Sequence, residues 1–169
     1  GIKNTINGKG GVRQALGNQY SAWEEAKADI LGLYMVCSLI DKGEITTISK
    51  EDALTTFIAG ILRSVRFGAA SSHGTANMMC FNFFEDNKAF VKNQEGIYEI
   101  NYENAIKAID SWAAMILEIE GTGDIIRAEQ YAKKNGQIRP SLQETLDVIN
   151  GKNIPKDIRY EQGKNVLGL

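Results

Sequence analysis

The chain has 169 residues, of which 43% are hydrophobic and 24% charged, and its formal net charge is −2. This composition is ordinary for a globular protein with an apolar core, and the lack of any basic run argues against a nucleic-acid partner. No apolar run approaches membrane-spanning length and no signal peptide is visible, so we expect no membrane partner.

The two cysteines, Cys37 and Cys80, both lie in apolar segments with helical spacing. Two such residues do not form a disulfide framework, and neither belongs to a Cys/His pattern typical of a metal site. We therefore expect two buried free thiols and a reducing, cytoplasmic compartment.

The hydrophobic pattern predicts helices in the first half of the chain. Residues 1–11 are polar and glycine-rich and are expected to form a turn, followed by one helix over about 12–41. Ser49 and Asp52 are three residues apart, which predicts a capping box at the start of a second helix. Gly68 is expected to end that helix.

The second half of the chain contains the only strand pattern. Residues 88–92 and 97–100, separated by a glycine-containing loop, predict a β-hairpin. The helices expected around it cover about 72–84, 102–120, 124–135 and 140–150, with an extended tail after Gly151. The sequence thus predicts a mainly α fold, a compact helical unit with one β-hairpin, and a single domain over 1–169.

One chemically informative segment lies in the first predicted helix, where Glu24, Glu25 and Asp29 stand among apolar residues. Successive helical residues are about 100° apart, so Glu25 and Asp29 share a face and Glu24 points elsewhere. We expect this helix to be buried. A buried carboxylate without a partner costs several kcal/mol, so these side chains would then need a cation.

Several partners are compatible with this spacing. Ser21 and Glu24 would form a capping box at an exposed helix start. Alternatively, Glu25 and Asp29 would bracket a structural arginine. The candidates are Arg13, Arg63 and Arg66. The face would otherwise be solvated, or one carboxylate would bind a metal while another orients a metal ligand.

The second informative segment, residues 71–77, contains His73, the only histidine. It follows a run of small residues near a predicted helix start. A single histidine is compatible with an ordinary hydrogen-bonded residue or with a group that polarises a reacting carbonyl. It does not complete a catalytic zinc site, which usually has three protein ligands, and the chain has no His-Glu-x-x-His pattern.

Together these segments resemble the dipeptidyl-peptidase III family of zinc exopeptidases. Residues 20–34 contain a Glu-Glu-x-Lys/Arg-Ala-Glu/Asp pattern similar to the second zinc motif of that family. Residues 66–77 and 82–85 resemble its downstream histidine motif, and residues 154–159 resemble its C-terminal segment. The closest variety is the bacterial and plant branch, often fused to a nudix hydrolase domain. The resemblance implies the C-terminal part of a zinc-peptidase catalytic lobe.

The resemblance also implies roles for individual residues. Glu25 would be the third zinc ligand, and Asp29 would position the histidine ligands and tune their basicity. His73 and Glu24 are the candidate catalytic residues: His73 would polarise the scissile carbonyl, and Glu24 would help Asp29 to orient the ligands. In that family zinc activates water for attack on a peptide carbonyl, with the glutamate of an upstream His-Glu-x-x-x-His motif as the base.

The chain departs from the family pattern in two ways. The upstream motif is missing and is expected to lie before Gly1, and several members have arginine where this chain has Asn77, a candidate outer contact of the site. We therefore expect this chain to need the upstream half of the same protein and to be inactive alone, with weak zinc binding. An exposed apolar surface where that half packs would favour self-association.

The predicted activity of the longer protein is release of dipeptides, or a related small unit, from the N-termini of peptide substrates. One alternative is a zinc hydrolase on the same scaffold with a substrate other than a peptide. The other is a non-enzymatic helical interaction module, which predicts that Glu25 and His73 lie far apart or that Glu25 pairs with an arginine.

Overall fold

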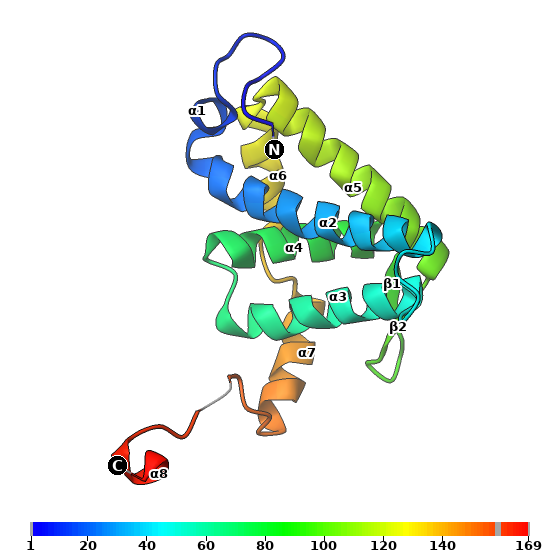
Figure 1. The fold of residues 1–169 in the computed structure, drawn as a ribbon, viewed down its shortest axis with the longest axis vertical. Coiled ribbons are helices and arrows are strands. Elements are labelled where there is room, and N and C mark those ends of the chain that lie inside the picture. The colour runs from blue at the N-terminus through cyan, green and yellow to red at the C-terminus, as the bar shows by residue number, and fades with distance from the viewer. Residues whose placement is uncertain (1, 158–159, 169) are drawn as a thin grey trace.

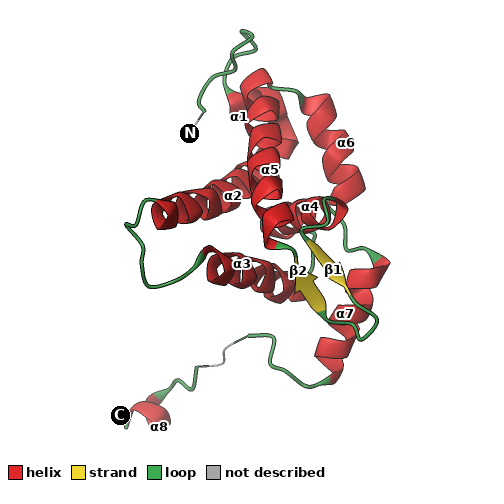
Figure 2. Ribbon diagram, turned by 90° about the vertical axis from the view of Figure 1, so that its right-hand side faces the viewer, coloured by secondary structure: helices red, strands yellow, loops and turns green. Residues whose placement is uncertain are grey.

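The fold is mainly helical with one two-stranded antiparallel hairpin, as the sequence predicts (Figures 1 and 2). The computed structural model describes residues 2–157 and 160–168. Its elements in chain order are α1 (Val12–Leu16), the 3-10 turn η1 (Gly17–Gln19), α2 (Tyr20–Asp41), α3 (Lys50–Ser64), the 3-10 turn η2 (Val65–Phe67), α4 (Ser72–Asp86), β1 (Phe90–Lys92), β2 (Tyr98–Ile100), α5 (Tyr102–Thr122), α6 (Ile125–Asn135), α7 (Pro140–Gly151) and α8 (Lys164–Leu167).

Helix starts follow the capping residues that the sequence supplies. At α3 the Ser49 hydroxyl accepts from the Asp52 N–H while the Asp52 carboxylate accepts from the Ser49 N–H, so the predicted capping box is confirmed. Asp124 caps α6 in the same side-chain-to-backbone manner, and Pro140 stands at the first position of α7. Local sequence therefore sets where these helices begin.

Three predicted boundaries are wrong. The helix expected over 12–41 is interrupted by η1, because Gly17 adopts a positive φ of 52° and ends α1. The helix expected over 102–120 runs on through Gly121 to Thr122, and α5 ends at the left-handed Gly123. The tail after Gly151 includes α8, which the sequence pattern did not indicate, and Ile158 and Arg159 lie outside the described residues.

Helices α2 and α4 lie side by side, with α3 and α5 packed against both (Figure 1). Aromatic rings from four helices meet at this contact, with Trp112 of α5 at its centre. Its ring centroid lies 5.8 Å from that of Trp23, 5.0 Å from Phe83 and 5.3 Å from Tyr131. Trp23 and Trp112 are fully buried. Because Trp23 immediately precedes Glu24 and Glu25, this packing fixes the rotation of α2 and hence the directions of both carboxylates.

Both cysteines are buried and free, as predicted. Burial raises the pKa of the Cys37 and Cys80 thiols, which keeps them protonated and unreactive at neutral pH. Within the described part of the chain, no helix combines the length and the apolar character that a membrane span requires.

Candidate functional site

The acidic residues of α2 lie at the surface, and the expectation that they are buried is wrong. The side chains of Glu24 and Glu25 are 31% and 36% exposed, and Asp29 is exposed as well. The reason is the rotation of α2: its buried face is formed by Trp23, Ala26, Lys27, Ile30, Leu33 and Cys37. Glu25 and Asp29 share a face, as predicted, but that face borders solvent.

Glu25 contacts the histidine of the second motif. His73 Nδ1 lies 3.3 Å from Glu25 Oε2. His73 is the second residue of α4, whose cap Ser71 accepts from the Gly74 N–H, and its side chain is 68% exposed. Since both partners are partly solvated, this contact adds little to stability. Its significance is geometric, because it joins the two motifs that the sequence singled out.

The structure excludes two of the arrangements considered for the acidic helix. None of the candidate arginines pairs with Glu25 or Asp29: Arg13 stacks over Tyr20, Arg63 reaches Asp157, and Arg66 donates to the carbonyls of Ile154 and Pro155. The capping box of Ser21 and Glu24 is also absent, since both lie inside α2, which begins at Tyr20. The non-enzymatic module predicted Glu25 and His73 apart, or Glu25 on an arginine, and the structure shows neither.

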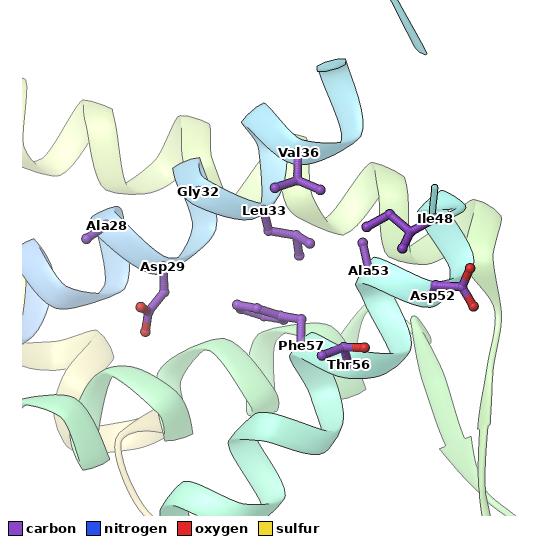
Figure 3. Close-up of a pocket in the computed structure, with 10 residues that line it drawn as sticks. All are labelled: Ala28, Asp29, Gly32, Leu33, Val36, Ile48, Asp52, Ala53, Thr56 and Phe57. Carbon is purple, nitrogen blue, oxygen red and sulfur yellow. The ribbon is translucent and has the colours of Figure 1, made fainter. Parts of the chain in front are cut away.

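Asp29 lies next to this pair. Although Asp29 is exposed, partial desolvation of its carboxyl raises the pKa, His73 opposes that effect, and Glu25 adds to it. The same residue lines a groove of about 500 Å³ between α2 and α3 (Figure 3). The other lining residues are Ala28, Gly32, Leu33, Val36, Ile48, Asp52, Ala53, Thr56 and Phe57. Glu25 and His73 do not line this groove, so Asp29 is the link between the groove and the pair.

Asn77 lies one helical turn after His73. Its Nδ2 donates a hydrogen bond of 2.8 Å to Ser64 Oγ at the end of α3. Asn77 thus ties the start of α4, where His73 stands, to the end of α3. In the structure, Asn77 therefore has a structural contact between two helices.

The cation of this region is Lys27, which the sequence analysis did not single out. Lys27 Nζ lies 2.6 Å from Glu24 Oε1 and 2.5 Å from Glu120 Oε2 on α5. Glu120 is fully buried, and its Oε1 has no hydrogen-bond partner among the described residues. The buried carboxylate that needs a cation therefore exists, but it is Glu120. The sequence indicated this burial, because Glu120 lies four residues after Ile116, on the apolar stripe of its helix.

This ionic contact keeps Lys27 charged. Burial lowers the pKa of Lys27, but the hydrogen bonds that its ammonium donates to Glu120 and Glu24 outweigh that effect and the pKa is raised. Burial raises the pKa of Glu120, and Lys27 opposes this by stabilising the carboxylate. Lys27 is therefore a cation held between one buried and one half-exposed carboxylate.

Comparison with known proteins gives the geometry a context. Two solved structures are similar to nearly the whole chain. The structure of dipeptidyl-peptidase III from Corallococcus sp. strain EGB matches 94% of it with a TM-score of 0.86 and 36% identity. The structure of DPP III from Caldithrix abyssi matches 92% of it with a TM-score of 0.84 and 28% identity. This chain resembles dipeptidyl-peptidase III in both fold and sequence. The expected fold class, a mainly α unit with one β-hairpin, is confirmed.

A curated relative agrees with the predicted branch. Over 147 residues the chain is 34% identical to a protein of Arabidopsis thaliana named Nudix hydrolase 3. No protein-family model matches the chain. The chain spans 19% of that relative and 29% to 30% of the two dipeptidyl-peptidase III chains, so its similarity is to one part of longer proteins.

Proposed function

We propose that this chain is the C-terminal part of the catalytic domain of a zinc-dependent exopeptidase similar to dipeptidyl-peptidase III. The observation that carries the proposal is the contact of Glu25 with His73, 3.3 Å apart, from two separate motifs of a chain with this fold. The substrate would be the N-terminal end of a peptide. The longer protein would work in the cytoplasm, which the two free thiols favour.

The side chains present fit a contribution to a zinc site, and fall short of a complete one. Within the described residues, no three His, Cys, Asp or Glu side chains gather in a group that would hold a metal ion. A catalytic zinc usually has three protein ligands, and a carboxylate oxygen is an ordinary one. Glu25 is partly exposed, and among the described residues only its Oε2 has a partner, His73. We therefore infer that Glu25 supplies one ligand and that residues upstream of Gly1 supply the others.

The neighbouring side chains have roles that follow from their places. When bound, zinc would supply a Lewis acid and an activated water. His73, with most of its ring in solvent, can donate a hydrogen bond to a carbonyl oxygen as charge develops on it. Glu24 and Asp29 stand on either side of Glu25 along α2 and can accept hydrogen bonds from histidine ligands, which orients those ligands. Asn77 holds the segment that carries His73.

The test is substitution of Glu25 by alanine in the longer protein that carries this chain and its upstream half. We expect one zinc per protein, loss of that zinc in Glu25→Ala, and a fall of about 100-fold or more in hydrolysis of dipeptidyl arylamides. Glu103→Ala is the matched control, because Glu103 is an exposed glutamate on α5 whose one ion pair within the described ranges is with Lys107. Zinc content is measured by elemental analysis.

Two results would contradict the proposal. One is a longer protein without zinc, and the other is a Glu25→Ala variant that keeps both zinc and activity. A panel of other amides and esters tests the substrate class: zinc-dependent activity on those compounds alone would replace the peptidase assignment with another hydrolase on the same scaffold.

A further inference from the structure

A row of three charged residues leads from the core of the protein to the edge of the candidate site. Glu120 of α5 is fully buried, Lys27 of α2 is 8% exposed, and Glu24 is 31% exposed. Lys27 Nζ bridges the two carboxylates at 2.5 and 2.6 Å. The row ends at the residue next to Glu25 in sequence.

Stability alone does not account for this arrangement. Removing charges from water is costly, and replacement of a buried ion pair by apolar side chains of similar size is often neutral or stabilising. One oxygen of Glu120 also lacks a hydrogen-bond partner among the described residues, which adds to the cost. What the arrangement supplies is a fixed position for Lys27, which has no free rotation while it holds two short hydrogen bonds.

A fixed Lys27 in turn fixes Glu24. A half-exposed glutamate normally samples several rotamers, and an ordinary surface pair restrains it weakly. Here the cation is itself buried and anchored from α5, so the Glu24 side chain is held through its Oε1. Its Oε2 has no partner among the described residues and is free to accept a hydrogen bond from outside the chain.

We propose that Lys27, anchored by the buried Glu120, is a positioning residue that holds Glu24 beside Glu25 in the orientation that a metal ligand from upstream requires. This inference rests on the proposed zinc site. The pair of Lys27 and Glu120 would act without contacting the metal or the substrate.

The experiment uses the longer protein and separates positioning from stability. The variants are Lys27→Met, the double variant Lys27→Met/Glu120→Leu, and Arg139→Met as a control. Arg139 also bridges two carboxylates, Glu85 and Asp86, but at the opposite end of α4 from His73. The measurements are the zinc dissociation constant by chelator competition, the visible spectrum of the cobalt-substituted protein, and the urea midpoint of unfolding.

We expect Lys27→Met to destabilise the protein, because it leaves Glu120 buried and unpaired. The double variant should recover the urea midpoint, yet its zinc affinity should stay weakened by about tenfold and its cobalt spectrum altered, since Glu24 has no anchor. When Glu24→Ala is added to the double variant, the loss of zinc affinity should be no larger than for Glu24→Ala alone. Arg139→Met should lower the midpoint without changing zinc affinity.

A purely structural role predicts the opposite for the double variant, namely recovery of zinc affinity and spectrum together with the midpoint, and that result would overturn the inference. If the variants with Lys27→Met do not fold, comparison of Glu24→Ala with the unaltered protein decides, because unchanged zinc affinity there also overturns it. A longer protein that binds no zinc at all would overturn the proposed function as well, so the two failures are distinguishable.

Discussion

Gly74, next to His73, occupies a place where no side chain fits. A Cβ there would lie 2.6 Å from the Gly68 carbonyl oxygen and 2.7 Å from Ala69 Cα. These are backbone atoms, so they cannot move aside as a flexible side chain would. The glycine lets the segment before α4 pass close to the first turn of the helix that carries His73.

We therefore predict that Gly74→Ala destabilises the chain by about 1–3 kcal/mol, the usual cost of overpacking. Gly60→Ala is the control: it is also a helical glycine, on α3, but a Cβ there meets nothing within 4 Å. That variant should gain up to about 1 kcal/mol, because alanine is the better helix former. Urea unfolding of both variants measures the difference, and equal stabilities would contradict the close passage.

At this scale the sequence predicted the relationships along a helix better than those between helices. The shared face of Glu25 and Asp29 follows from helical geometry, and the structure has it. Whether that face is buried depends on how α2 is rotated, which Trp23 and its partners on other helices decide. The pairing of Lys27 with Glu120 is long-range, so local spacing could not reveal it.

At the scale of elements, Arg139 joins the end of α4 to the start of α7. Its guanidinium donates to Glu85 at 2.6 Å and to both oxygens of Asp86 at 2.7 and 2.8 Å. Arg139 immediately precedes Pro140, so the contact fixes the point at which α7 begins. The hydrogen bond from Arg139 is the main cause that lowers the pKa of the Asp86 carboxyl.

This contact predicts a pH dependence with a defined sign. A carboxyl whose pKa is lower in the folded state stabilises the fold above its unfolded pKa of about 3.9, and that stability is lost as the pH falls through the folded pKa. Asp86→Asn should therefore reduce stability at pH 7 by less than about 1 kcal/mol, because Asp86 is half-exposed. The difference from the unaltered chain should shrink below about pH 4.

The measurement is urea unfolding of both proteins at pH 7, 5 and 3. Asp110→Asn controls for loss of charge in general, because Asp110 is an exposed aspartate on α5 that forms no hydrogen bond or ion pair with the described residues. A difference for Asp86→Asn that stays constant down to pH 3 would be incompatible with the contact.

Element boundaries were predictable where a side chain caps the helix itself. Ser49 and Asp52 satisfy the first N–H groups of α3 from within the same segment, so the start of α3 was visible in the sequence. The break at η1 was not visible, because the apolar spacing continues through Gly17 and a glycine in a helix pattern is tolerated. The contact of η1 with α6 joins segments that are far apart in the sequence, so local spacing could not predict it.

At the scale of the whole molecule, the second half of α2 is apolar even on its exposed side. From Ile30 to Ile40 it has no charged residue, and Met35 and Leu39 on its outer side are 60% and 38% exposed. A helix that is apolar on every side is normally buried on every side. The groove between α2 and α3 continues this apolar surface through Gly32 and Val36 (Figure 3). Since the chain spans only 19% to 30% of the longer proteins it resembles, we expect further chain to cover this face.

We predict that the 169-residue chain alone self-associates through this face and that Met35→Glu/Leu39→Glu abolishes the association, because each buried charge would cost several kcal/mol. Sedimentation velocity over a concentration series measures it. Ile126→Glu is the matched control, since Ile126 is 66% exposed on α6 and lies outside this face. It should leave association unchanged. The longer protein should not associate through α2, since we expect its upstream half to cover the same residues. Association that persists in the longer protein, or in Met35→Glu/Leu39→Glu, would assign it to another surface.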